Sequence, residues 1–188
     1  MTARRSGTGP RPATPAAIFL AGFMGSGKST LGRRLAAALA WPFVDLDAEI
    51  ERRAGRSIGE MFAAHGEEWF RDCEHAALCE QAAISRRGAP RVVALGGGAY
   101  AFERNRSLLR PVGPTVWLDA PVGMLWERVC RDPRRPLARD RAEFARMYEA
   151  RRGAYAQADC RIDASACPAD MQRQVFGLGW MQELRADG

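Results

Sequence analysis

A glycine-rich segment with one lysine constrains the fold of this chain more than any other feature of its sequence. Residues 22–29 are GFMGSGKS, which fits the pattern G-x-x-x-x-G-K-[ST]. The apolar run AAIFLA precedes it, and a helical pattern with Leu31, Leu35 and Leu39 on one face follows it. A buried strand, a glycine turn and a helix N-terminus in this order form a phosphate-binding loop. The sequence therefore predicts an α/β fold that binds the phosphates of a nucleotide.

The residue types in this loop suit a nucleoside triphosphate. Glycines let backbone N–H groups turn towards phosphate oxygens. Lys28 is expected to reach the β- and γ-phosphates, and the Ser29 hydroxyl to ligate Mg²⁺. Lys28 is also the only lysine in a chain with 28 Lys and Arg residues, which indicates a position that requires a compact ammonium group. The expected nucleotide-binding set for ATP, with Mg²⁺ as cofactor, is Gly25, Ser26, Gly27, Lys28, Ser29 and Thr30.

Short apolar runs alternate with helical patterns along the rest of the chain. Strands are expected at 16–21, 43–45, 91–95, 115–118 and 160–162, and helices at 29–40, 48–53, 57–64, 67–85, 103–109, 122–130, 141–156 and 168–184. The alternation predicts a three-layer α/β/α fold with a central five-stranded parallel sheet, as in P-loop nucleotide-binding proteins. We expect a disordered basic arm at 1–15, a single domain at 16–184 and a tail at 185–188.

Charge and composition exclude several classes of function. The net charge is +6, but the arginines are spread along the chain and the aromatic residues do not interleave with them, so no nucleic-acid partner is expected. No run reaches the ~20 apolar residues of a membrane-spanning helix, and the N-terminus lacks the apolar core of a signal peptide. Five scattered cysteines without a CxxC pair predict free thiols in a cytoplasmic protein. We expect that protein to be a monomer.

Several motifs follow the phosphate loop in a characteristic order. They are DLD at 45–47, GEEWFRDCE at 66–74, GGG at 96–98, RPL at 135–137, RRGAY at 151–155 and IDA at 162–164. In this order the chain resembles the shikimate kinases, a small branch of the nucleoside-monophosphate-kinase-like P-loop proteins, from residue 16 to about 184. The resemblance implies ATP-dependent phosphorylation of the 3-hydroxyl of shikimate, a step towards chorismate and the aromatic amino acids.

The resemblance also implies the catalytic residues. Asp45 would hold Mg²⁺, and Asp47 would accept the proton of the attacking hydroxyl. The alternative for this pair is that one carboxylate only caps the next helix, and Asp47 stands where a cap could lie. Arg135 would lie over the transferring phosphoryl group, on a mobile lid at 131–141. This lid departs from the family at Ala138, where a second leucine is common.

The acceptor is expected to lie against helices at about 46–85. Arg71 and Arg152 would bind its carboxylate, although Arg151 and Arg152 could be exchanged. Glu74 would orient Arg71 or meet a ring hydroxyl. Arg128 would stack on adenine, and the segment at 162–164 would wrap the adenine ring. The rest of the expected acceptor site comprises Asp47, Phe62, Phe70, Gly96, Gly97 and Gly98, with the N–H of Gly97 as a donor. The alternatives are an exposed ion pair for Arg71 and Glu74, and ordinary core packing for the two phenylalanines.

Two alternative functions are also compatible with the sequence. Another small-molecule kinase of the same group, such as a gluconate kinase, would keep the phosphate loop but need not keep two carboxylate-binding arginines. A non-catalytic sensor with this fold would be expected to lose some of Lys28, Ser29, Asp47 and Arg135, and all of these are present. A GTPase is excluded, because the guanine motif N-K-x-D requires a second lysine.

Overall fold

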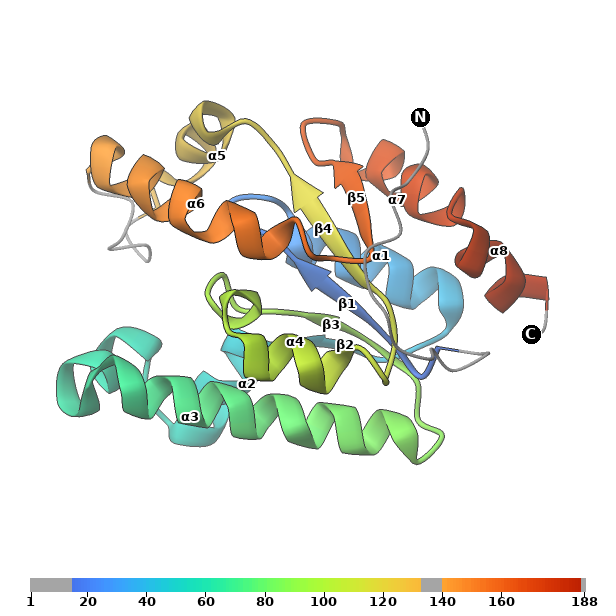
Figure 1. The fold of residues 1–188 in the computed structure, drawn as a ribbon, viewed down its shortest axis with the longest axis horizontal. Helices are drawn as coiled ribbons and strands as arrows, with labels where there is room; N and C mark the ends of the chain where they lie inside the picture. Colours follow the sequence, from blue (N-terminus) through green and yellow to red (C-terminus); the bar gives the residue numbers. More distant parts are fainter. Residues whose placement is uncertain (1–14, 133–139, 187–188) are drawn as a thin grey trace.

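A parallel sheet forms the centre of the molecule (Figure 1). The computed structural model describes residues 15–132 and 140–186. The strand order is β2-β3-β1-β4-β5, and every pair of neighbours is parallel. The strands are β1 (Ala17–Ala21), β2 (Phe43–Asp45), β3 (Arg91–Ala94), β4 (Thr115–Asp119) and β5 (Cys160–Asp163). The predicted five-stranded parallel sheet is therefore confirmed.

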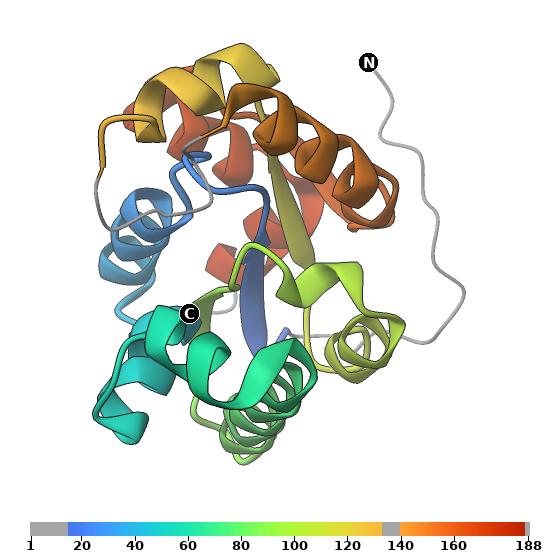
Figure 2. The same cartoon turned by 90° about the vertical axis from the view of Figure 1, so that its left-hand side faces the viewer.

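Helices cover both faces of this sheet. They are α1 (Lys28–Leu39), α2 (Leu46–Ala54), α3 (Ile58–Arg86), α4 (Glu103–Leu109), α5 (Val122–Val129), α6 (Arg141–Tyr155), α7 (Pro168–Phe176) and α8 (Gly179–Ala186), with a short 3₁₀ turn at Ala99–Ala101. Helix α1 packs against α7, and α3 packs against α4. Figure 2 shows α1 on one side of the sheet and α4 and α6 on the other.

The strands are apolar because helices cover them on both sides. Every residue of β1, β3 and β4 is buried, and Phe19 and Leu20 at the centre of the sheet are 0% exposed. A parallel sheet buried on both faces needs nearly continuous apolar strands, which is the pattern that the runs at 16–21 and 91–95 show. The phosphate loop follows β1, the central strand, so it starts at the carboxyl edge of the sheet.

The predicted break between the helices at 57–64 and 67–85 is confirmed, because Gly66 interrupts α3 with φ 81° and ψ 177°, which a residue with a Cβ rarely adopts. The C-terminal helical pattern differs from the prediction. The last helix, expected as one element at 168–184, is divided into α7 and α8. Gly177 and Gly179 flank the break, and glycine has a low helix propensity.

No helix within the described ranges, 15–132 and 140–186, is both long enough and apolar enough to cross a bilayer.

The close approach of the turn at Gly113 to β1 gives a test of the packing. A Cβ at Gly113 would overlap the backbone carbonyl oxygen of Ala17, which cannot move without shifting the strand. We expect Gly113→Ala to lower the free energy of unfolding by about 2–4 kcal/mol. Gly123→Ala is the matched control, because a Cβ there meets nothing within 4 Å, and it should change stability by less than about 1 kcal/mol. Urea unfolding of both variants measures the difference, and equal stabilities would contradict this account.

Candidate functional site

The phosphate loop is shaped by glycines in left-handed conformations. Gly25 has φ 82° and Gly27 has φ 91°, and Gly27 is the N-cap of α1. These turns direct backbone N–H groups of the loop towards its centre, where the positive end of the helix dipole adds to them. The Lys28 ammonium lies against the loop and donates to the carbonyl oxygens of Gly22 at 2.8 Å and Phe23 at 3.1 Å.

Ser26 and Thr30 carry two further hydroxyl groups of the predicted nucleotide-binding set. The Ser26 hydroxyl is buried, and no described residue accepts from it or donates to it. A buried polar atom without a partner in a glycine loop fits a site that takes a polar ligand. Thr30, in contrast, is exposed in the first turn of α1.

Ser29 and Asp45 form a contact that could hold a metal. Ser29 Oγ donates to Asp45 Oδ2 at 2.5 Å, and Asp45 Oδ1 accepts from the N–H of Ala48, so Asp45 caps α2. The helix cap is thus Asp45, while Asp47 lies inside the first turn. No group of three or more His, Cys, Asp or Glu side chains gathers for a metal within 15–132 and 140–186. A hydroxyl beside one carboxylate nevertheless suits Mg²⁺, which keeps several waters and takes further ligands from phosphates.

The glycine turn after β3 leaves room for charged groups to approach its backbone closely. A Cβ at Gly96 would overlap Asp47 Oδ1 and lie 2.8 Å from Glu74 Oε1. A Cβ at Gly98 would lie 2.7 Å from both terminal nitrogens of Arg71. The predicted carboxylate from α2 and the predicted arginine from α3 therefore meet at one turn, and they do so because that turn has no side chains.

Arg71 is held in place by two carboxylates. Its Nη1 donates to Glu74 Oε2 at 3.0 Å, and its Nη2 donates to Glu67 Oε1 at 2.9 Å. Arg71 is 9% exposed and Glu74 is 1% exposed, so their contact is a buried ion pair rather than an exposed one. A guanidinium fixed in this way is preorganised to bind a planar anion.

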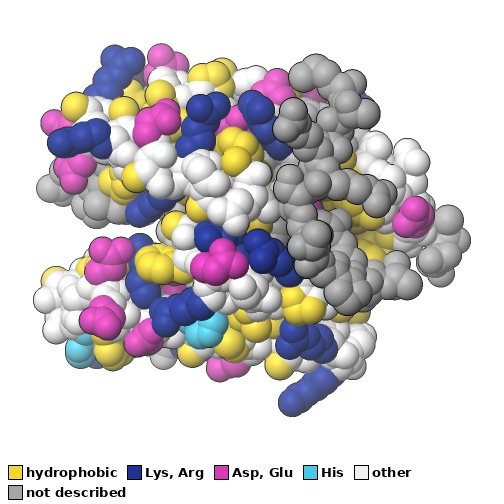
Figure 3. Space-filling view, in the orientation of Figure 1, with side chains coloured by type: hydrophobic (Ala, Val, Ile, Leu, Met, Phe, Trp, Pro, Cys, Tyr) yellow, Lys and Arg dark blue, Asp and Glu magenta, His cyan; other side chains and the backbone are white. Residues whose placement is uncertain are grey.

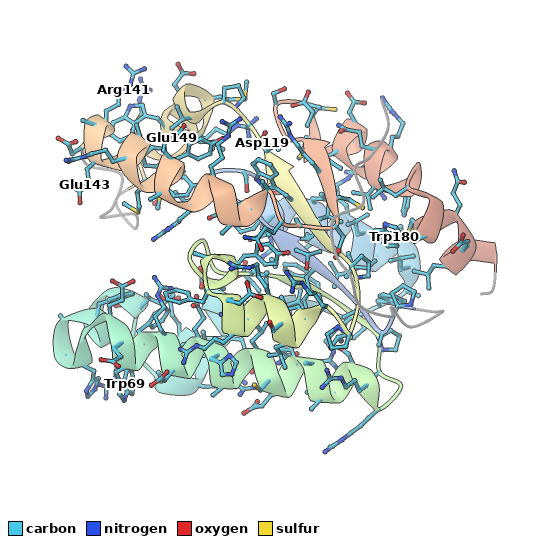
Figure 4. All side chains as sticks on the ribbon, in the orientation of Figure 1. Trp69, Asp119, Arg141, Glu143, Glu149 and Trp180 are labelled. Atoms are coloured by element: carbon cyan, nitrogen blue, oxygen red, sulfur yellow. The ribbon has the colours of Figure 1, made fainter. Side chains whose placement is uncertain are left out.

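Three phenylalanine rings surround the Arg71 guanidinium. Its central carbon lies 5.8 Å from the Phe62 centroid, 5.4 Å from Phe70 and 5.2 Å from Phe102. The two predicted rings, Phe62 and Phe70, lie together with centroids 4.7 Å apart. Phe102 was missed because a half-exposed aromatic residue after a glycine run gives no signal in the sequence. Trp69, on the same helix, points away from the site and is 41% exposed (Figure 4).

Burial changes the acidity of Glu74. Removal from water raises the pKa of its carboxyl to about 7, Arg71 opposes this rise, and the negative charge of Asp47 adds to it. Because the folded pKa exceeds the unfolded value of 4.5, Glu74 stabilises the fold below pH 4.5 and loses this contribution as the pH rises through 7.

Helix α6 brings Arg151 to the glycine turn. Arg151 Nη1 lies 3.4 Å from the carbonyl oxygen of Gly97, and its guanidinium lies over the Phe23 ring of the phosphate loop at 5.6 Å. Its neighbour Arg152 is exposed, and no contact with the glycine turn is recorded for it among the described residues. Of the two neighbours that the sequence could not separate, the structure therefore places Arg151 at the site, whereas the sequence analysis favoured Arg152.

Tyr155 fixes the end of α6 to the same turn, a contact that the sequence analysis missed. Its hydroxyl donates to the carbonyl oxygen of Gly97. The side chain is 0% exposed, and burial raises the pKa of the hydroxyl, so it remains a neutral donor. A lone tyrosine in a helical pattern reads as core, which is why no sequence signal identified it.

The remaining predicted residues lie on the nucleotide side. Arg128 Nη1 contacts the carbonyl oxygens of Gly25 at 3.2 Å and Ala164 at 3.1 Å, so it joins the phosphate loop to the turn after β5. That turn is the segment expected to wrap adenine. Arg135, with residues 133–139 of the predicted lid, lies outside the described residues.

The surface of the molecule is hollowed between two of its parts. Figure 3 shows an indentation between the part that carries α6 and the part that carries α3 and α4, with Lys or Arg side chains along its walls. Arg71 comes from α3, Arg151 from α6, and the glycine turn lies between them. The arrangement can bind an anionic acceptor next to a nucleotide.

The buried carboxyl gives a pH-dependent prediction. Between about pH 5 and 8, wild type should lose roughly 3 kcal/mol of stability that Glu74→Gln keeps, because the variant has no carboxyl to ionise in the buried site. Only the slope is compared, since the substitution also changes the contact with Arg71. Urea unfolding at several pH values measures it, and parallel curves for the two proteins would rule out a raised pKa.

Proteins of one family are similar in sequence to this chain. The sequence model of the shikimate kinase family matches residues 24–176. The shikimate kinase of Cereibacter sphaeroides is 43% identical over 150 residues, which cover 78% of this chain and 73% of that protein. That of Persephonella marina is 40% identical over 162 residues, which cover 85% of this chain and 96% of that protein.

Solved structures agree as well. The shikimate kinase from Acinetobacter baumannii in complex with shikimate superposes with a TM-score of 0.80 at 33% identity, and the match covers 94% of this chain and 98% of that one. The family match spans most of the described sequence, and the relatives align along most of their own length. The chain belongs to the shikimate kinase family.

Proposed function

We propose that this chain transfers the γ-phosphoryl group of ATP to the 3-hydroxyl of shikimate. The observation that carries the proposal is the convergence of Arg71 and Arg151 on one glycine turn beside the phosphate loop. Two guanidinium groups at one turn form a site for a carboxylate, and shikimate offers a carboxylate on the same ring as the hydroxyl to be phosphorylated. The relative solved with shikimate bound supports this acceptor.

The acceptor carboxylate would be bound from both sides of the cleft. Arg71 is held by Glu67 and Glu74, so it loses little freedom when a ligand binds. Arg151 takes the role that the sequence analysis gave to Arg152. The Phe62 and Phe70 rings beside Arg71 would cover the carbon ring of the acceptor, and the Gly97 N–H would add a donor.

Asp47 is proposed as the base. Its carboxylate lies against Gly96, on the same turn as the arginines, so a ring held by its carboxylate would present a hydroxyl to it. The buried Glu74 carboxylate lies at the same glycine and keeps Arg71 in position. Positioning both reactants in this way supplies much of the acceleration of a phosphoryl transfer.

The phosphate loop would bind the phosphates of ATP. Lys28, beside the loop carbonyls, would turn its ammonium to the β- and γ-phosphates, and loop N–H groups would hold their oxygens. Ser29 and Asp45 would hold Mg²⁺, directly or through water; when bound, the ion neutralises charge on the phosphates. Arg135 keeps its proposed role as the cation over the transferring group.

We also propose that the protein acts as a monomer in the cytoplasm. All five cysteines are described, and none of them forms a disulfide. Thiols that remain reduced are typical of a reducing compartment.

The test of the function is a coupled assay of ATP consumption with shikimate, quinate and gluconate. We expect turnover with shikimate and little with gluconate, because gluconate has no ring for the Phe62 and Phe70 walls. Loss of turnover in Lys28→Ala, with an unchanged circular dichroism spectrum, serves as the control for a contaminating kinase. Turnover with gluconate but not with shikimate would favour the rival sugar-acid kinase.

Arginine variants test which residues bind the acceptor. Arg71→Lys and Arg151→Lys should each raise the KM for shikimate about 10- to 100-fold, because lysine lacks the planar two-donor fork. Arg152→Lys is the matched control and should change this KM less than about twofold, since Arg152 is exposed. The KM for ATP should stay constant in all three. A larger effect in Arg152→Lys than in Arg151→Lys would restore the assignment made from the sequence.

Asp47→Asn separates the base from the metal ligand. We expect kcat to fall at least about 100-fold while the Kd of MgATP changes little, because the lost group acts on the hydroxyl. Asp45→Asn should instead weaken MgATP binding, which titration with the nucleotide measures. If the Asp47 variant loses nucleotide affinity and keeps kcat, the two roles are reversed.

A further inference from the structure

A cysteine, a histidine and an asparagine meet where α3 packs against α4, outside the phosphoryl-transfer site. His75 and Cys79 lie one helical turn apart on α3, and Asn105 comes from α4. His75 Nδ1 lies 2.6 Å from Asn105 Oδ1, and His75 Nε2 lies 3.6 Å from Cys79 Sγ. The possible nucleophile Cys79 thus contacts the possible base His75, and Asn105 orients that base. This arrangement is one that activates a thiol.

The hydrogen bonds of Asn105 fix which nitrogen of His75 carries the proton. Asn105 is 1% exposed, and its Nδ2 donates to the carbonyl oxygen of Ala99 at 2.8 Å. The amide oxygen must therefore face His75, because a flipped amide would set its oxygen against the Ala99 carbonyl oxygen. An oxygen at this position accepts from Nδ1–H of His75. With the proton on Nδ1, the ring presents the lone pair of Nε2 to the thiol of Cys79.

The surroundings of the other cysteines differ. The Cys160 sulfur accepts from the indole N–H of Trp180 at 3.3 Å, and the Cys130 thiol donates to the carbonyl oxygen of Glu127 at 3.8 Å. Cys73, on the same helix as Cys79 and also partly exposed, makes no thiol hydrogen bond with a described residue. Cys79 alone among the described cysteines contacts an imidazole nitrogen.

We propose that Cys79 is a base-assisted thiol that small disulfides modify covalently. The S–H proton moves to His75 Nε2 as the Cys79 sulfur attacks one sulfur of the disulfide. A mixed disulfide forms, the S–S bond of the reagent breaks, and the leaving thiolate takes up the proton from the imidazolium. Cys79 is partly exposed, so a small reagent can reach it.

The experiment follows the reaction with 2,2′-dithiodipyridine by stopped-flow absorbance. Cys167→Ser is the parent protein, because the exposed Cys167 would react early for reasons of access alone. We expect a fast phase that Cys79→Ser removes and Cys73→Ser, the matched control, retains. Adding His75→Gln should slow this phase about tenfold or more, since the base is lost. In denaturant all variants should react at similar rates.

Two outcomes would overturn the proposal. One is a fast phase that survives Cys79→Ser, and the other is a Cys79 rate that His75→Gln leaves unchanged in a folded protein. Circular dichroism and Tm establish folding, and His75→Asn replaces the glutamine variant if that variant does not fold. If neither histidine variant folds, the comparison of Cys79→Ser with Cys73→Ser decides whether Cys79 is the fast thiol. Phosphoryl transfer is not part of the readout, so the result is independent of the proposed function.

Discussion

The close approach of charged side chains to the glycine turn at 96–98 is the constraint on which the site depends. Asp47 and Glu74 lie against Gly96, and Arg71 lies against Gly98, at distances that a Cβ would not permit. Opposite charges from α2 and α3 are therefore packed around one piece of backbone. Each would be costly to bury alone, and their mutual contacts offset that cost. The glycines thus determine where the acceptor site can lie.

The sequence carried enough information to predict the fold and most of the residues that gather at the site. The phosphate loop fixed the centre of the sheet, because strand, glycine turn and helix must follow one another there. Arg71, Asp47 and the glycine turn were assigned by resemblance, and the structure brings them together. The break at Gly66 was predicted, but the division of the last helix at Gly177 was not, since it depends on local backbone conformation that tertiary packing decides.

What the sequence could not provide was the direction in which neighbouring side chains point. Arg151 and Arg152 are equivalent in a helical pattern, and only the packing of α6 shows that Arg151 reaches Gly97. Phe102 and Tyr155 contribute through contacts with residues distant in the chain, and such contacts leave no local pattern. The same holds for the Asn105 bond that sets the His75 tautomer, because it joins two helices.

Helix α6 contacts both the phosphate loop and the glycine turn at 96–98. Phe144 and Tyr148 pack edge-on against Phe23 of the phosphate loop, while Tyr155, at the end of the same helix, bonds to Gly97. A rigid helix cannot shift at one of these places without shifting at the other. A displacement of α6 at the acceptor turn would therefore also move the rings that pack on the phosphate loop. The helix thus fixes the spacing between the phosphate loop and the acceptor turn.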